Sequence, residues 1–131
     1  MIVRGATTRA GAAALCQVLL AACVAGVRVT LSVPPESQPW PWLSEYGVES
    51  VVETEAGLVE RLAHPDDAER LRVWEPISTA ARAAANGTGV TVIDAPVLAN
   101  GRLELRWYLR EQAVSQVLHR YGSVPGPADP R

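Results

Sequence analysis

The sequence contains no lysine and no phenylalanine, and only two of its 131 residues are cysteines. Without lysine, the chain cannot form the phosphate-binding loop whose lysine reaches the phosphates of a nucleotide. All twelve cationic side chains are arginines scattered along the chain, and fourteen acidic residues bring the net charge to −2. Because nucleic-acid binding needs a surplus of positive charge on one face, this balance argues against a nucleic-acid partner.

The two cysteines, Cys16 and Cys23, are seven residues apart in an apolar stretch. On a helix this spacing places them on one face, about two turns apart and too far to form a disulfide. Free cysteines are mostly interior, so both are predicted to be small buried side chains. Nothing in this pattern indicates an oxidising compartment. We therefore expect a cytoplasmic protein.

The sequence also has no long hydrophobic run of the kind that spans a membrane. The apolar stretch Ala10–Val27 is rich in alanine and glycine, whereas a convincing membrane span needs about 20 apolar residues. The stretch follows Arg4 and Arg9, as in a secretory signal, and Leu20–Cys23 fits the short pattern at which bacterial lipoproteins are cleaved. An envelope lipoprotein beginning at Cys23 is therefore one alternative, but a core helix accounts for more of the local sequence.

The first 33 residues predict a strand, a helix and a second strand. Met1–Arg4 and Val27–Val33 are rich in β-branched residues, and Thr7 or Thr8 can cap a helix over Ala10–Ala25. The helical period is marked by Leu15, Val18, Leu19, Ala22 and Ala25, and Gly26 ends the helix. Strand, helix and strand in this order form a βαβ unit, which has parallel strands.

Strands and helices continue to alternate after a proline-rich loop, Pro34–Pro41. The predicted strands are Val48–Glu53, Arg70–Trp74 and Val90–Asp94, and the predicted helices are Trp42–Tyr46, Glu55–Ala63 capped by Thr54, and Ser78–Asn86. This alternation predicts an α/β fold, with a Rossmann-like, mostly parallel sheet and helices on both faces. We assign residues 1–98 to this domain.

Ligands of such sheets bind at the carboxyl ends of the strands, but the sequence there lacks the usual signature. Gly5 and Gly11 follow the first strand without the further glycines of a dinucleotide-binding loop. Thr7 and Thr8 could hold a phosphate, although a helix cap is the commoner use of such residues. A small stand-alone enzyme or nucleotide-binding protein, using the strand ends near Gly5 and Asp94, remains a rival hypothesis.

The sequence also gives little support for a metal site or for a catalytic nucleophile. His64 and His119 are far apart, and neither has a cysteine or a second histidine at ligand spacing. No serine lies in a nucleophile elbow. We therefore predict no catalytic residue, no metal site and no cofactor in this chain.

Residues 99–122 carry a different pattern, which predicts a helix from Gly101 to about Ala113 and then a strand to Tyr121. Leu103, Trp107 and Arg110 form one helical stripe, and Leu105 and Leu109 form its neighbour. Glu104 and Glu111 lie near Arg102, Arg106 and Arg110, and such ladders on a helix usually form solvated or interface pairs. The strand mixes apolar and polar residues on both faces, so we expect a projecting arm. Residues 123–131 are predicted to be a disordered tail.

This segment resembles a known family. Arg102–Leu105, Tyr108–Ser115 and His119–Gly122 are similar to the C-terminal motif of proline utilization A, the bifunctional proline dehydrogenase and NAD-dependent L-glutamate γ-semialdehyde dehydrogenase. Ala14–Ala22 followed by Gly26–Val29 also resembles a helix-to-strand step in that family's C-terminal domain. The similarity is specific over about 22 residues and loose over the preceding hundred. Here Ser123 follows the motif, where the family usually has asparagine.

The resemblance implies a non-catalytic, aldehyde-dehydrogenase-like domain that packs on a catalytic module and helps to close its active site. Neither the catalytic cysteine nor the general base of that enzyme has a counterpart in this chain. The chain would then be a fragment or subunit of an NAD-dependent aldehyde dehydrogenase, with the catalytic domain or a second copy of itself as protein partner and no membrane partner. The implied interface residues are Arg110, Glu111, Gln112, His119, Arg120, Tyr121 and Gly122.

Overall fold

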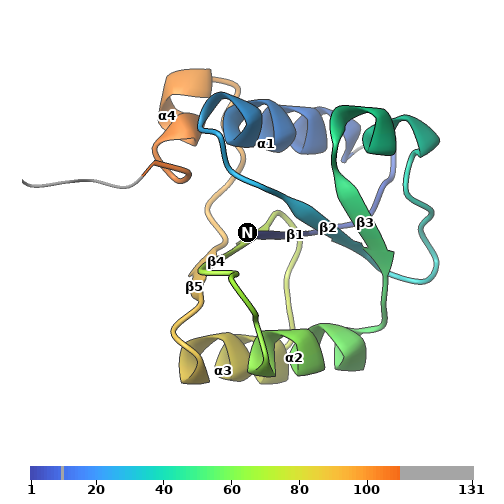
Figure 1. Cartoon of the computed structure of the whole chain (residues 1–131), viewed down its shortest axis with the longest axis vertical. Coiled ribbons are helices and arrows are strands. Elements are labelled where there is room, and N and C mark those ends of the chain that lie inside the picture. Colours follow the sequence, from blue (N-terminus) through green and yellow to red (C-terminus); the bar gives the residue numbers. More distant parts are fainter. Residues whose placement is uncertain (10, 110–131) are drawn as a thin grey trace, which may run out of the picture.

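The structure, a computed structural model, describes residues 1–9 and 11–109 and contains one sheet of five parallel strands (Figure 1). The strands are β1 (Ile2–Arg4), β2 (Thr30–Val33), β3 (Glu49–Val52), β4 (Arg70–Val73) and β5 (Thr91–Ile93). Their order across the sheet is β3-β2-β1-β4-β5, with β1 in the centre. The predicted α/β class with a parallel, Rossmann-like sheet is confirmed.

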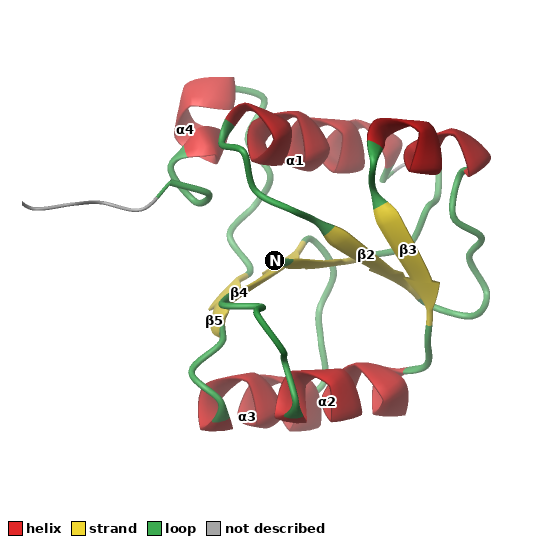
Figure 2. Cartoon of the chain, viewed as in Figure 1, coloured by secondary structure: helices red, strands yellow, loops and turns green. Residues whose placement is uncertain are grey.

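Helices cover both faces of the sheet (Figure 2). One layer consists of α1 (Ala12–Val24), the 3₁₀ helix η1 (Pro41–Tyr46) and α4 (Gly101–Leu105), and the other consists of α2 (Glu55–Ala63) and α3 (Thr79–Gly87). Each layer has its own apolar core, because a strand in a parallel sheet is buried on both faces. Within the described ranges, no helix is both long and apolar enough to cross a bilayer.

The N-terminal βαβ unit forms as predicted. β1 pairs in parallel with β2, with Ile2 opposite Thr30, and Leu15 and Val18 of α1 are completely buried in the core above the sheet. Cleavage before Cys23, as the lipoprotein alternative requires, would remove the central strand of the sheet and most of α1.

Several helix ends also agree with the sequence. The hydroxyl oxygen of Thr54 accepts a hydrogen bond from the amide of Gly57 at 3.2 Å, and that of Ser78 accepts one from Ala81 at 3.0 Å, so each caps its helix. Gly47 follows η1 with a φ angle of +71°, which is the left-handed conformation that glycine adopts without strain.

The start of α1 and the exposure of its cysteines differ from the prediction. Its N-cap is Gly11, and Thr8 instead accepts a hydrogen bond from the Gly11 amide at 3.1 Å. Cys16 and Cys23 share one face of the helix, as predicted, but that face is exposed, so the prediction that they are buried was wrong. The helical period did identify the side that packs on the sheet, because Leu15, Val18 and Ala22 are completely buried and Leu19 and Ala25 pack against the same core.

The C-terminal helix is shorter than predicted, because it ends at Leu105 and residues 106–109 form a turn and a bend. The guanidinium group of Arg70 donates to the carbonyl oxygens of Trp107 at 2.7 Å and Leu109 at 3.0 Å, so these carbonyls bond to β4 rather than to a continuing helix. The predicted strand from Ala113 to Tyr121 and the tail 123–131 lie outside the described residues.

Candidate functional site

The carboxyl ends of β1, β4 and β5 border the crevice where the strand order reverses, which is where open parallel sheets bind ligands. A hollow of about 500 Å³ lies there. Its walls are the loop after β1, the start of α1 and the segments after β4 and β5, contributed by Thr8, Gly11, Ala14, Trp74, Glu75, Asp94, Ala95, Pro96 and Val97. This hollow is the candidate functional site.

The indole ring of Trp74 covers the loop that would bind phosphate. A Cβ atom added at Gly5 would overlap the six-membered part of this ring, so glycine is required there for the ring to approach the backbone. A Cβ atom at Gly11 would lie 3.0 Å from the carbonyl oxygen of Ala6 and 3.3 Å from Nε1 of Trp74. In dinucleotide-binding loops, glycines admit a pyrophosphate group. Here Gly5 instead admits a side chain of the protein itself.

Polar groups of the same loop are also engaged within the chain. The amide of Ala6 donates to Oε2 of Glu75 at 3.2 Å, so a carboxylate already lies where this amide could meet an anion. The hydroxyl of Thr7 donates to the carbonyl oxygen of Gln38 at 2.6 Å, and that of Thr8 accepts from Gly11. The two threonines considered for phosphate binding therefore serve the local structure.

Next to the crevice, four polar side chains connect the ends of β1, β2 and β3. Arg4 donates to Oγ of Ser32 and to the carbonyl oxygen of Glu53, both at 3.0 Å. Ser32 donates to the Glu53 carboxylate at 2.6 Å, and Nε of Arg61 donates to both oxygens of that carboxylate at 3.1 and 3.0 Å. Because Glu53 is bonded by both neighbours, it is poorly suited to act as a general base.

Glu55 extends this network towards α3. Its carboxylate accepts a hydrogen bond from the Ser78 amide at 3.0 Å and lies 3.7 Å from the guanidinium group of Arg4. Hydrogen bonding by Ser78 lowers the pKa of Glu55 below its ordinary value, against the opposing effect of partial burial, and the charge of Arg4 adds to the lowering. Glu55 therefore carries a negative charge that stabilises the start of two helices.

The most deeply buried polar group is an ion pair between β4 and α4. Nε and Nη2 of Arg72 donate to the two carboxylate oxygens of Glu104 at 2.9 and 3.1 Å, and both side chains are almost completely buried. Nη1 of Arg72 donates to the carbonyl oxygens of Val73, Ile93 and Ala95. The pair therefore binds α4 and the segment after β5 to the sheet.

Tyr108 completes this buried group, since its hydroxyl donates to Glu104 at 3.0 Å. Burial raises the pKa of Tyr108, and the negative charge of Glu104 raises it further, so the phenol stays protonated. The expectation that Glu104 forms a solvated or interface pair with an arginine of its own helix was wrong, because its partner is the buried Arg72 of β4. The signal that could have revealed its burial is Arg72, because an arginine inside a central parallel strand needs a buried acidic partner.

The predicted interface residues lie outside the described residues, and the structure places only the beginning of their segment. Each of the two predicted stripes is only partly buried, because Leu105 and Trp107 pack against the core whereas Leu103 and Leu109 are exposed. The most buried side chains of this part are those of Glu104 and Tyr108. Arg106 is exposed and lies over the ring of Trp107, 4.9 Å from its centroid.

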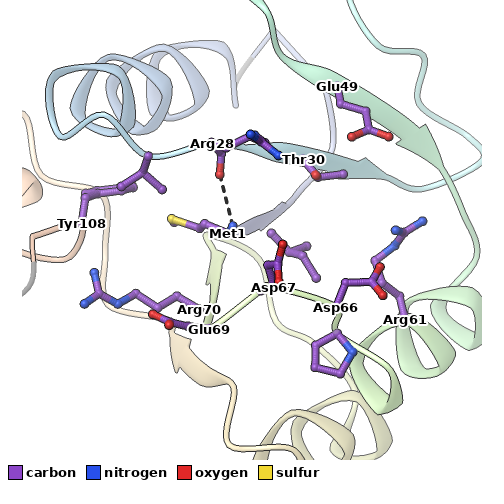
Figure 3. Close-up of a pocket in the computed structure, with 14 residues that line it drawn as sticks. Met1, Arg28, Thr30, Glu49, Arg61, Asp66, Asp67, Glu69, Arg70 and Tyr108 are labelled. Carbon is purple, nitrogen blue, oxygen red and sulfur yellow. Dashed lines mark hydrogen bonds between the residues drawn. The ribbon is translucent and has the colours of Figure 1, made fainter.

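A second hollow, of about 480 Å³, lies at the opposite, amino-terminal edge of the strands (Figure 3). Acidic and basic side chains line it together, including Asp66, Asp67, Arg61 and Arg70. In the part of the chain that the structure describes, no group of three or more histidine, cysteine, aspartate or glutamate residues could hold a metal ion. The amino-terminal edge is also not where such folds bind ligands.

Comparison with models of known protein families, with curated proteins and with solved structures found no match to this chain.

Proposed function

We propose that this chain is a non-catalytic interface module of a proline-catabolism enzyme, where it supports the active site of the L-glutamate γ-semialdehyde dehydrogenase part. The observation that carries the proposal is the closed loop after β1. Trp74 covers Gly5, and Glu75 bonds to the Ala6 amide, at the point where a dehydrogenase of this fold would bind the cofactor pyrophosphate. The negative charge of the Glu75 carboxylate at that point also repels the negatively charged pyrophosphate of a cofactor.

The positions of the thiols support the same conclusion. An aldehyde dehydrogenase needs a nucleophilic cysteine close to the bound cofactor, as the resemblance implies. Cys16 and Cys23 are instead exposed on the face of α1 that points away from the sheet. The two carboxylates that line the crevice are both engaged within the chain, since Glu75 accepts a hydrogen bond from the Ala6 amide and Asp94 accepts one from Arg82.

We propose that the interface itself lies in residues 110–122, which directly follow residues that are hydrogen-bonded to β4. Arg70 bonds to the last described residues through the carbonyl oxygens of Trp107 and Leu109, and Arg72 holds α4 through Glu104. These bonds fix the positions of Trp107 and Leu109, which directly precede residues 110–122. Arg110 and Arg120 would supply planar donors for carboxylates or carbonyl groups of the catalytic module.

The test is to combine this chain with the catalytic module of an L-glutamate γ-semialdehyde dehydrogenase that lacks its own C-terminal domain. NADH formation should rise about tenfold, which corresponds to about 1.4 kcal/mol of barrier. The Arg110→Ala/Glu111→Ala variant should lose this effect, whereas Arg82→Ala, a change at an exposed ion pair on α3, should retain it. The proposal would be contradicted by turnover of this chain alone, or by equal activity of the catalytic module with and without it.

A truncated chain separates docking from folding. Deletion of residues 113–131 should change the free energy of unfolding by no more than about 1–2 kcal/mol, the range expected when no core residue is lost. The same deletion should abolish the stimulation of the catalytic module. A truncated chain that does not fold would show that the segment belongs to the core.

The second candidate is a stand-alone nucleotide-binding protein, which the hollow at the carboxyl ends of the strands favours. Asp94 borders this hollow, and its carboxylate accepts a hydrogen bond from Arg82 at 2.8 Å. This bond, together with the positive charge of Arg82, lowers the pKa of Asp94. A nucleotide would have to displace Trp74 to reach the loop amides, so we place this candidate second.

A further inference from the structure

Both charged side chains that line the hollow at the carboxyl ends of β1, β4 and β5 are acidic. They belong to Glu75 and Asp94, and the other described residues of this lining are uncharged. Two negative charges attract a cation and repel the phosphate groups of a nucleotide. The charge of the lining is therefore opposite to the charge that the nucleotide-binding candidate needs.

The parallel pairing of β4 and β5 brings the two carboxylates to the same edge of the sheet. Arg72 of β4 lies opposite Ile93 of β5. Asp94 directly follows Ile93, and Glu75 is the third residue after Arg72, so the two acidic residues belong to segments that leave neighbouring strands. Because both segments border the same hollow, a small cation bound there is attracted by both negative charges.

Each carboxylate keeps acceptor positions for a ligand. Oε2 of Glu75 accepts from the Ala6 amide at 3.2 Å and Oδ2 of Asp94 accepts from Arg82 at 2.8 Å, whereas an ionised carboxylate offers about four acceptor positions. The hydrogen bond and the positive charge of Arg82 lower the pKa of Asp94, so its carboxylate is ionised at neutral pH. The Arg82–Asp94 pair is exposed, and such pairs contribute little stability, so a bound cation can share Asp94 with Arg82.

Trp74 provides the aromatic part of the lining. Its Nε1 is buried and has no hydrogen-bond acceptor among the described residues, so the ring is held by packing against Gly5 and the core rather than by a hydrogen bond. An indole ring attracts cations more strongly than the rings of tyrosine and phenylalanine. An indole beside two carboxylates suits an organic cation better than a metal ion, since the described residues offer no group of three or more metal ligands.

We propose that this hollow binds a small organic cation that carries a guanidinium group. A guanidinium group is planar, so it can lie against the indole ring of Trp74 while its N–H groups donate to Glu75 and Asp94. The volume of about 500 Å³ falls within the range of about 300–1,000 Å³ for small-molecule sites. The lining includes none of residues 110–122, so this inference and the proposed function can fail independently.

The test is an NMR titration of the full chain with n-butylguanidinium and, separately, with n-butylurea, which has nearly the same shape but no charge. n-Butylguanidinium should shift the signals of the Trp74 indole N–H and the Ala95 amide saturably, with a dissociation constant below about 1 mM at low salt. Raising the salt concentration to about 0.5 M should weaken this binding, because salt screens the attraction between charges. n-Butylurea should bind at least about fivefold more weakly, because it lacks the charge that the carboxylates attract.

Substitutions test the role of each charge. Glu75→Gln, which keeps an acceptor for the Ala6 amide, and Asp94→Asn should each weaken binding of n-butylguanidinium about fivefold. Glu60→Gln removes the same charge from an exposed position on α2 and should leave the affinity unchanged. Arg82→Ala should tighten binding about threefold, because it removes the cation that competes for Asp94. The inference would be overturned by equal affinities for the two compounds, by the lack of any saturable shift, or by unchanged affinity in both Glu75→Gln and Asp94→Asn.

Discussion

The helices on one face of the sheet, α2 and α3, carry charged residues on their outer sides, whereas α1 on the other face is apolar all round. Glu60 and Arg82 are exposed on α2 and α3, and their inner sides bury leucine or alanine. α1 buries Leu15 and Val18 in the same manner but also exposes Leu20. Folding requires only the inner sides. The packing among the described residues therefore does not account for the apolar outer side of α1.

The layers also differ in how they are fixed to the sheet, and the largest expected effect tests this difference. α4 is held by the buried Arg72–Glu104 pair, whereas α2 and α3 bury only apolar side chains and form their ion pairs at partly exposed positions. Arg72→Leu leaves the buried Glu104 carboxylate without its positive counter-charge, with the Tyr108 hydroxyl still donating to it, so the free energy of unfolding in urea should fall by about 3–5 kcal/mol. The double variant Arg72→Leu/Glu104→Leu should recover much of this loss. A single-variant loss below about 1 kcal/mol would show that the pair does not anchor α4.

The same substitution on the two layers should have unequal effects. Leu58 on α2 is completely buried, so Leu58→Ala should cost about 2–5 kcal/mol of stability. Leu20 on α1 is exposed, so Leu20→Ala should change monomer stability by less than about 0.5 kcal/mol. Urea denaturation of the two variants and of the unchanged chain measures both costs. Similar costs at the two positions would contradict the assigned inner side of α1.

Helix capping gives a smaller contrast. Thr54 accepts a hydrogen bond from the Gly57 amide as the N-cap of α2, so Thr54→Ala should cost about 1 kcal/mol. Thr8 precedes the N-cap of α1, which is Gly11, so Thr8→Ala should cost less than about 0.5 kcal/mol. Thermal unfolding followed by circular dichroism compares the two variants. A larger loss for Thr8→Ala would show that Thr8 carries the cap after all.

The smallest expected effect is a change in how the stability of the chain depends on pH. Glu55 lies at the start of α2, and its pKa is lower in the folded chain than the ordinary value of 4.5. Its stabilising contribution is therefore complete above about pH 4.5 and is lost as the pH falls through the lower folded value. Glu55→Gln should reduce the acid-induced loss of stability by no more than about 0.5 kcal/mol, since the side chain is partly exposed. Urea unfolding of both proteins between pH 3 and pH 7 provides the test, and an unchanged acid loss would assign the effect to another group.

The fold could be predicted from local patterns, because alternating strands and helices, the caps at Thr54 and Ser78, and Gly47 each act within a few residues. The exposure of Cys16 was missed because its prediction rested on the general tendency of cysteine to be buried, and not on the positions Leu15, Val18 and Ala22, which identify the inner side of α1. The burial of Glu104 was missed because Arg72, its partner, lies 32 residues earlier and was assigned only to a strand. The interface residues 110–122 remain a prediction.

The most direct test of the non-catalytic assignment is an NMR titration of the full chain with NAD⁺ or pyrophosphate, observing the backbone amides of Ala6 and Gly11. Because Glu75 accepts the Ala6 hydrogen bond and Trp74 covers Gly5, neither amide signal should shift saturably, even at millimolar ligand. Saturable shifts at both amides, with a dissociation constant below about 1 mM, would show that the loop binds the cofactor and would contradict the account.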